Sequence, residues 1–186
     1  ALLKEPVTLT GLDPSSLQGD KEIVSILRRF GAKVTQGPRS FTICGNELHG
    51  INIDAENIPD LVPILSLVAA LAKGETRISH IARLRIKESD RVASIMNTLI
   101  RLGANIREED NTLIIEGVES LHTASISSYN DHRIAMMAAI ASLRTEGSVT
   151  IEGAEAVQKS YPAFFEDFAI FSLCISTSFK VSRTKM

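Results

Sequence analysis

The feature that most constrains the fold is an internal repeat of about 72 residues. The segment 30–34 (FGAKV) is echoed by 102–106 (LGANI), so that Gly31 and Gly103 lie 72 residues apart, while Asp60 and Asp131 lie 71 apart. A third copy begins near Val149. A period of this length exceeds that of solenoid repeats and corresponds to a whole supersecondary unit. We therefore expect two complete units and the start of a third.

Each unit is predicted to contain a strand, an amphipathic helix, three short strands and an apolar helix. The expected ranges in the first unit are 7–10, 20–30, 33–36, 41–44, 51–54 and 60–72. In the second unit they are about 77–81, 90–102, 105–107, 113–116, 124–127 and 131–143. The third unit offers a strand from Val149 and a helix over about 162–168, with Pro162 expected at its first position. Gly31 is the expected C-cap of the first amphipathic helix.

Two helices decide the architecture. The segments 61–72 and 134–143 are apolar almost all round, and such helices must be buried. The first is the longest apolar run and is too short to span a membrane. We therefore predict an α/β (α+β) fold in which βαβαββ units surround a pseudo-threefold axis, with the helices inside and the sheets outside.

Composition excludes several classes of protein. With 44% hydrophobic and 23% charged residues and a net charge of −2, the 186-residue chain gives no electrostatic reason to expect a nucleic acid or an anionic membrane as a partner. Cys44 and Cys174 form no CxxC motif, which favours a reducing compartment. The four histidines lack metal-ligand spacing, and we see no signal peptide.

The two ends of the chain look different from its middle. Ala1-Leu2-Leu3 has no start signal and resembles the end of an apolar helix, which indicates a fragment. The repeat stops near Ala169, and the Ser/Thr-rich residues that follow end in Lys180, Arg183 and Lys185. We expect the domain to occupy 1–168 and residues 169–186 to form a disordered or non-native tail. A docking extension is the alternative.

The candidate chemistry lies where helices begin. Residues 84–91 (LRIKESDR) lead into the predicted helix 90–102, with Ser89 or Asp90 as its N-cap. A cation in the first helical turn gains nothing from the helix dipole, so Lys87 and Arg91 beside the helix N-terminus suggest a pocket for a phosphate or carboxylate. Glu88 could donate or accept a proton there. The simpler interpretation is an exposed turn with a Glu88–Arg91 pair.

Charged residues also occur at the starts of helices in the other units. The apolar helices begin at Asp60 and at residues 130–133 (NDHR), and the third unit's helix follows Lys159. Around a threefold axis these helix starts would share one face and collect the residues Asp60, Lys87, Glu88, Arg91, His132, Arg133 and Lys159. Such a face would bind a dianionic ligand, and its two carboxylates could divide acid and base roles. The simpler alternatives are that Asp60 and Asp131 are helix caps, His132 orients its neighbours and Lys159 is a surface lysine.

Taken together, these motifs resemble the 5-enolpyruvylshikimate-3-phosphate synthase family. The matching segments are 17–20 (LQGD), 57–60 (NIPD), 84–91 (LRIKESDR), 129–136 (YNDHRIAM) and 159–162 (KSYP). The resemblance runs from residue 1 to about Phe168 and covers somewhat under half of the family's chain. It implies most of one of two domains, with the active site in the cleft between them.

The resemblance also implies the chemistry. The family transfers the enolpyruvyl group of phosphoenolpyruvate to the 5-hydroxyl of shikimate 3-phosphate and releases phosphate, without a cofactor or metal. By match, Asp60 accepts the hydroxyl proton and Glu88 handles the proton of the methylene carbon. Asp60 and Lys87 contact shikimate 3-phosphate. Phosphoenolpyruvate is held by a set of four residues: Arg91, Arg133, Lys159 and His132.

Two departures from the family limit this interpretation. Residues that the family supplies from its other domain are absent, and the tail after Phe168 does not match. The implied protein is a cytoplasmic monomer of aromatic amino acid biosynthesis, whereas the isolated chain is expected to be inactive. The alternatives are the sister enzyme that acts on UDP-N-acetylglucosamine and a non-catalytic anion-binding half-domain.

Overall fold

The repeat is the organising feature of the fold in the computed structural model, which describes residues 1–12, 18–174 and 181–184. The first unit contains β1 (Val7–Thr10), α1 (Ile23–Phe30), β2 (Lys33–Gly37), β3 (Ser40–Cys44), β4 (Asn52–Asp54) and α2 (Val62–Ala70). The second contains β5 (Glu75–Ser79), α3 (Arg91–Arg101), β6 (Asn105–Glu109), β7 (Thr112–Glu116), β8 (Ala124–Ser127) and α4 (His132–Ala141). The third contains β9 (Val149–Glu152) and α5 (Phe164–Cys174), and β10 (Val181–Thr184) follows. Short 3-10 turns flank the helices: Gly19–Glu22, Pro59–Leu61, Ala82–Ile86, Ser142–Arg144 and Ala154–Lys159.

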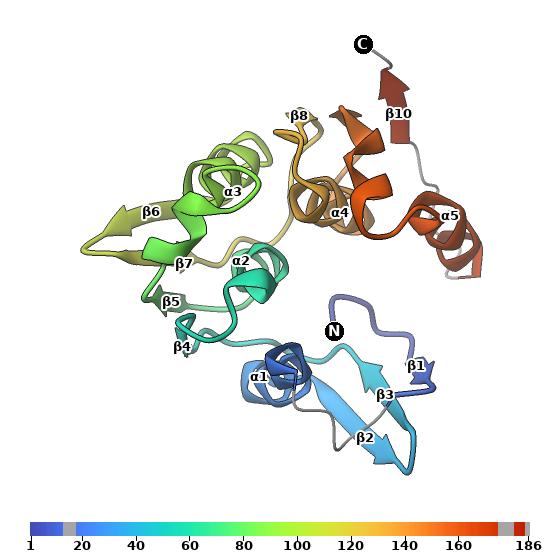
Figure 1. Cartoon of the computed structure of the whole chain (residues 1–186). Coiled ribbons are helices and arrows are strands. Elements are labelled where there is room, and N and C mark those ends of the chain that lie inside the picture. Colours follow the sequence, from blue (N-terminus) through green and yellow to red (C-terminus); the bar gives the residue numbers. More distant parts are fainter. Residues whose placement is uncertain (13–17, 175–180, 185–186) are drawn as a thin grey trace.

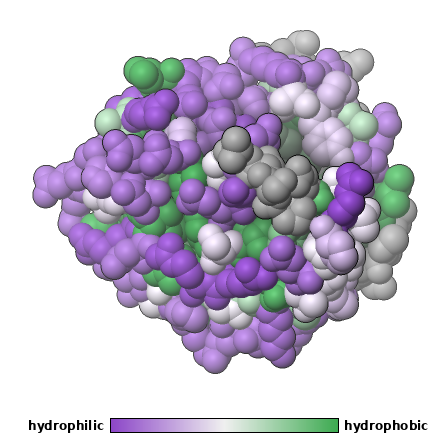
Figure 2. Space-filling model, turned by 60° about the horizontal axis from the view of Figure 1, so that its bottom comes forward, coloured by the Kyte–Doolittle hydropathy of each residue, from purple (hydrophilic) through white to green (hydrophobic). Residues whose placement is uncertain are grey.

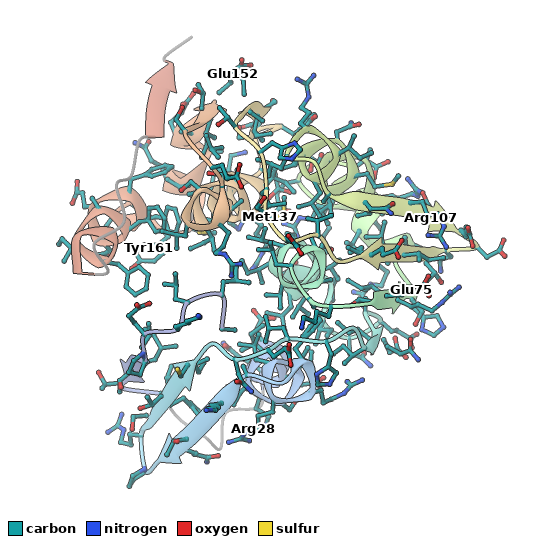
Figure 3. The ribbon with its side chains drawn as sticks, turned by 180° about the vertical axis from the view of Figure 1, so that it is seen from behind. Arg28, Glu75, Arg107, Met137, Glu152 and Tyr161 are labelled. Atoms are coloured by element: carbon teal, nitrogen blue, oxygen red, sulfur yellow. The ribbon has the colours of Figure 1, made fainter. Side chains whose placement is uncertain are left out.

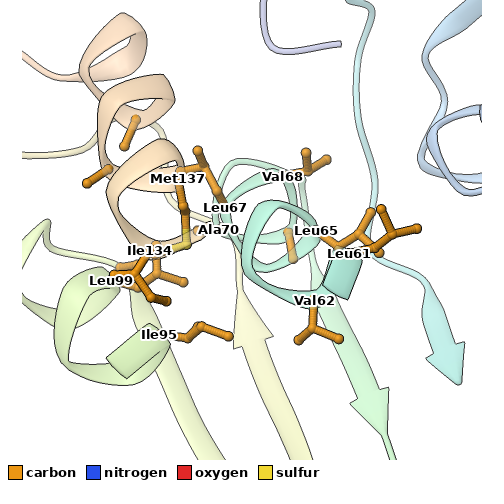
Figure 4. Packing of buried hydrophobic residues seen from close by; sticks show 14 of the residues in the cluster. Leu61, Val62, Leu65, Leu67, Val68, Ala70, Ile95, Leu99, Ile134 and Met137 are labelled. Atoms are coloured by element: carbon orange, nitrogen blue, oxygen red, sulfur yellow. The ribbon is translucent and has the colours of Figure 1, made fainter. Parts of the chain in front are cut away.

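The apolar helices lie inside, as predicted. In Figure 1, α2, α3 and α4 lie near the centre, and the sheets lie around them. Side chains of α2 and α4 meet in the core, where Leu65, Leu67, Ile134 and Met137 are at most 1% exposed (Figure 4). The amphipathic helix α3 adds Ile95 and Leu99 to the same cluster. The apolar helices α2 and α4 have no polar face to turn to water, so they form the centre rather than the surface.

The sheets show how one unit is joined to the next. In each complete unit the first, third and second strands pair antiparallel, giving the orders β1-β3-β2 and β5-β7-β6. The last strand of a unit instead pairs in parallel with the first strand of the following unit, as β4 does with β5 and β8 with β9. Each unit therefore contributes a strand to its neighbour's sheet.

Two glycines show that the repeat extends to backbone geometry. Gly31 directly follows α1, and Gly103 lies just past the end of α3. Their φ angles of 105° and 86° give a left-handed conformation that suits glycine. A histidine approaches each of them: the backbone N–H of His49 donates to Phe30 O at 2.9 Å, and that of His122 donates to Leu102 O at 2.7 Å. Gly31 is thus the C-cap of α1, as predicted.

The third unit differs from the expectations. The helix α5 begins at Phe164 rather than at Pro162, so proline does not occupy its first position, and it continues past Phe168 to Cys174. The strand β10 pairs in parallel with β9, where a disordered tail was expected. In the complete units the strand at this position runs antiparallel, as β3 does to β1. Residues 175–180 and 185–186 of the expected tail lie outside the described residues, and the division at 168 stays a prediction.

The outer surface is mainly polar. Figure 3 shows Glu75 and Arg107 at the outer sheet, far from Met137 in the interior, and Arg107 Nη2 lies 3.6 Å from Glu75 Oε2. The face in Figure 2 is mostly hydrophilic, with apolar residues visible between polar rims. No helix in the described part of the chain is both long enough and apolar enough to cross a membrane.

An apolar groove of about 370 Å³ lies among the N-terminal residues, the strands β1 and β3, and the helices α1, α2, α4 and α5. It is lined by α2 through Ile64 and Val68, by α4 through Ile140, and by α5 through Phe171. The remaining walls come from Ala1, Leu2, Leu3, Glu5, Val7, Leu9, Ile23, Leu27, Ile43 and Leu143.

Candidate active site

Turns that lead into three helices bring the predicted charged residues together. Asp60 lies in the Pro59–Leu61 turn before α2, and Arg91 is the first residue of α3. His132 and Arg133 open α4. These residues are up to 73 positions apart in the chain, yet Arg133 Nη2 donates to Asp60 Oδ2 at 3.1 Å. The expected shared face of helix starts is therefore present.

Arg91 is the centre of the cluster. Its side chain is fully buried and is surrounded by carboxylates: Nε donates to Asp131 Oδ2 at 2.8 Å, Nη1 to Asp60 Oδ1 at 2.6 Å, and Nη2 to Glu88 Oε2. Burial alone would lower the pKa of Arg91, but the hydrogen bonds and charges of these acids raise it above its usual value. The Glu88–Arg91 pair of the simpler interpretation thus exists within a larger network. Arg91 is not open to a ligand in this arrangement.

Asp60 is not a helix cap. The N-cap of its turn is Ile58, and the Asp60 carboxylate instead faces cations. Besides Arg91 and Arg133, Lys87 approaches it, with Nζ 3.3 Å from Oδ1. Partial burial opposes ionisation, but the hydrogen bond from Arg91 and the charges of Arg133 and Lys87 lower the pKa of Asp60. One carboxylate therefore bridges three of the predicted ligand-binding cations.

Asp131 is both a cap and an ion-pair partner. It is the N-cap of α4, where Oδ1 accepts from the backbone N–H of Arg133 at 2.9 Å, and its side chain is fully buried. Oδ2 also accepts from Ser89 Oγ at 3.1 Å. Burial would raise the pKa of Asp131, but the hydrogen bond and charge of Arg91 lower it. The sequence suggested only the cap, because nothing in it links Asp131 to a residue 40 positions away.

The structure shows which of the two candidate residues, Ser89 or Asp90, is the N-cap of α3. The Asp90 carboxylate accepts from the backbone N–H of Ala93 at 3.1 Å, so Asp90 is the N-cap. Ser89 turns toward Asp131 and Ser94 instead. The sequence offered Ser89 only as an alternative N-cap, and its place in the network of Asp131 and Arg91 was not predicted.

His132 and Lys159 lie at the edge of the cluster. His132 is 7% exposed, its Nδ1 is buried without a hydrogen-bond partner among the described residues, and burial lowers its pKa. Lys159 Nζ donates to the carbonyl oxygen of Asn130, the residue before the α4 cap. The structure therefore places Lys159 beside the turn that carries Asp131, His132 and Arg133.

This geometry suits acid–base chemistry next to an anion. The carboxylates of Asp60 and Glu88 remain 34% and 40% exposed, while the guanidinium that joins them is buried. Cations at helix N-termini attract phosphate and carboxylate groups, and two acids held by one arginine can take different protonation roles.

A second group of polar residues lies elsewhere, on the outer surface. The ligand atoms of Asp54, Glu56 and His80 lie within 4.8 Å of one another, and all three residues are exposed. His80 Nδ1 is 2.8 Å from Asp54 Oδ1, and this hydrogen bond raises the pKa of His80. The contact between His80 and Asp54 is an exposed ion pair. The spacing of the histidines in the sequence did not predict this pair.

Comparison with known proteins identifies relatives. The family model for EPSP synthase (3-phosphoshikimate 1-carboxyvinyltransferase) matches residues 1–168. The 3-phosphoshikimate 1-carboxyvinyltransferases of Clostridium acetobutylicum and Clostridium perfringens strain 13 are 50% and 48% identical over 166 and 167 residues. These alignments cover 89% of this chain in both cases, but only 38% and 39% of the relatives.

Solved structures agree with the fold. An EPSP synthase from Acinetobacter baumannii superposes with a TM-score of 0.77 at 30% identity, over 93% of this chain and 42% of that one. An enolpyruvyl transferase from Streptomyces tendae shares the fold with a TM-score of 0.69 at 21% identity, over 94% of this chain and 39% of that one. The α/β fold predicted from the repeat, with helices inside and sheets outside, is therefore confirmed, and these enolpyruvyl transferases share it. Since the family model spans most of the sequence, the chain belongs to the EPSP synthase family.

Proposed function

We propose that the protein to which this segment belongs transfers the enolpyruvyl group of phosphoenolpyruvate to the 5-hydroxyl of shikimate 3-phosphate. The observation that carries the proposal is Asp60, held between Lys87, Arg91 and Arg133. Asp60 accepts the hydroxyl proton as the oxygen attacks phosphoenolpyruvate. Glu88 delivers a proton to the methylene carbon and later removes it, and phosphate leaves.

Binding is divided among the cations. Arg91, Arg133 and Lys159, supported by His132, hold the carboxylate and phosphate of phosphoenolpyruvate, because guanidinium groups match planar anions. Lys87 and Asp60 contact shikimate 3-phosphate. The reaction forms a C–O bond to the acceptor and breaks the C–O bond to phosphate, with proton transfers by side chains and no net change of oxidation state, and the proposal includes no metal or organic cofactor. We propose a cytoplasmic monomer in the shikimate pathway that leads to chorismate, without nucleic-acid or membrane partners.

A second candidate function concerns the isolated chain. The chain spans less than two fifths of the length of the curated relatives described above. Its apolar groove beside α2 and α4 is open. These observations favour a half-domain that binds anions and needs a complementary segment for catalysis, because closure around both substrates is what excludes water from such a site.

A chimera tests the proposed function. Residues 1–168 of this chain would replace the matching segment of the Clostridium acetobutylicum relative, and phosphate release from phosphoenolpyruvate would be measured. We expect turnover with shikimate 3-phosphate but none with UDP-N-acetylglucosamine. The isolated chain is the control and should be inactive. A chimera that folds but uses neither acceptor, or that prefers the nucleotide sugar, would contradict the proposal.

A further inference from the structure

We infer that Asp60 serves as an internal anion in the unliganded site, and that an incoming anionic group must displace it from Lys87, Arg91 and Arg133. This inference rests on the proposed function and deepens it: the displacement frees Asp60 to act as the base. Binding of the anion and activation of the base would then be one event.

The first observation is the charge balance of the cluster. Three cations, Lys87, Arg91 and Arg133, are paired with the three carboxylates of Asp60, Glu88 and Asp131. These six charges cancel, so a dianion that added to the intact network would meet little net positive charge beyond that of Lys159, whose Nζ donates to a carbonyl oxygen at the edge of the cluster. A carboxylate therefore has to leave the cations before the dianion gains their full attraction.

The second observation shows which carboxylate must leave for all three cations to become free. Asp131 is fully buried and caps α4, so it is fixed. Glu88 contacts only Arg91 among these cations, whereas both carboxylate oxygens of Asp60 are used, Oδ1 by Lys87 and Arg91 and Oδ2 by Arg133. Asp60 is also 34% exposed, which gives its side chain room to rotate. Displacing this one group releases donors on all three cations.

The consequence for catalysis follows from the same contacts. While it is paired, Asp60 has a lowered pKa, despite its partial burial, because Arg91 donates a hydrogen bond and Arg133 and Lys87 lie nearby. A carboxylate with a low pKa is a weak base. When a bound anion takes over these cations, the carboxylate loses its stabilising partners and its proton affinity rises. The proton that it then accepts comes from the substrate hydroxyl.

The test is a titration of the full 186-residue chain with sodium sulfate at constant ionic strength, followed by NMR of the backbone amides. Sulfate stands in for the anionic groups and keeps its charge across the working pH range. Asp60→Asn should tighten sulfate binding by about tenfold. In the original chain, sulfate binds only those molecules in which Asp60 has left the cations, and this lowers the apparent affinity. Glu88→Gln is the matched control, because it removes a similar charge from the same arginine. It should tighten binding by no more than about threefold.

A second readout uses the unmodified chain. The Asp60 carboxyl carbon, followed by NMR against pH, should report a higher pKa with saturating sulfate than without it. This readout decides the question if Asp60→Asn does not fold. An unchanged pKa would overturn the inference.

The outcomes separate this inference from the proposed function. If sulfate binds near Arg91 and Arg133 but Asp60→Asn binds it no more tightly than Glu88→Gln, the anion site stands and displacement is wrong. If sulfate perturbs none of these residues in any variant, the anion site itself is wrong, and the proposed function falls with it.

Discussion

In the chimera with the Clostridium acetobutylicum relative, Glu88→Gln should lower kcat by about 10²–10⁴-fold, the usual loss when a general acid–base group is removed. Glutamine keeps the size of the side chain and can still accept a hydrogen bond from Arg91, but it cannot carry the proton. Because Glu88 is 40% exposed, the same change should alter the free energy of unfolding by no more than about 1 kcal/mol. Steady-state kinetics and urea unfolding measure the two effects separately.

The control for this variant is Glu108→Gln. Glu108 accepts from Arg85 Nη2 at 2.6 Å, so it is also a carboxylate paired with an arginine, but it lies on β6 outside the cluster. It should leave kcat within about twofold, since it removes no group that transfers a proton. If Glu88→Gln instead weakened phosphoenolpyruvate binding and left kcat intact, Glu88 would be a binding residue and the proton-transfer role would be wrong.

In the isolated chain, Asp131→Asn should lower the free energy of unfolding by about 3–5 kcal/mol, the range for breaking a buried ion pair. Asparagine is as good an N-cap as aspartate, so the cap of α4 is retained while the charge opposite Arg91 is lost. Urea denaturation measures the difference. Asp90→Asn is the matched control, because Asp90 caps α3 in an exposed position, and it should cost less than about 1 kcal/mol.

The stability difference between the original chain and Asp131→Asn should depend on pH, in a direction that follows from the pKa of Asp131. The folded-state pKa of Asp131 lies below the ordinary value of 3.8, because Arg91 outweighs the effect of burial. The ionised carboxylate therefore contributes stability above that ordinary pKa and loses it as the pH falls through the folded value. The difference between the original chain and Asp131→Asn should shrink below about pH 4. Equal losses for the Asp131 and Asp90 variants at neutral pH would mean that the buried pairing of Asp131 with Arg91 adds no more stability than an exposed charge at a helix cap.

Much of the fold could be predicted because periodicity is local. The apolar stretches gave α2 and α4 their interior positions, and Gly31 marked the end of α1. The third unit was less predictable, since Pro162 is compatible with several turn positions and α5 begins two residues later. Strand order and the parallel pairing of β10 depend on tertiary contacts that no single stretch of sequence carries.

The sequence predicted which residues gather at the candidate site, but not which of them form ion pairs with one another. Recurrence at helix starts brought Asp60, Lys87, Arg91 and Arg133 into one expected cluster, and the structure joins them. The burial of Arg91 was not foreseen, because an arginine at a helix start is usually exposed. Its partners come from turns 31 and 40 residues away, and only the folded chain shows that acids already occupy its donors.

The most direct test of the central claim, that helix starts from three units form one anion site, is a titration of the isolated chain with phosphoenolpyruvate at low ionic strength, followed by NMR of the backbone amides. The amides near Arg91, Arg133 and Lys159 should shift together with a single affinity, which should weaken as salt rises because the site is partly open to solvent. No product should form when shikimate 3-phosphate is added. Shifts confined to the outer sheet near Arg77 and Arg107, or separate affinities at the three helix starts, would contradict the claim.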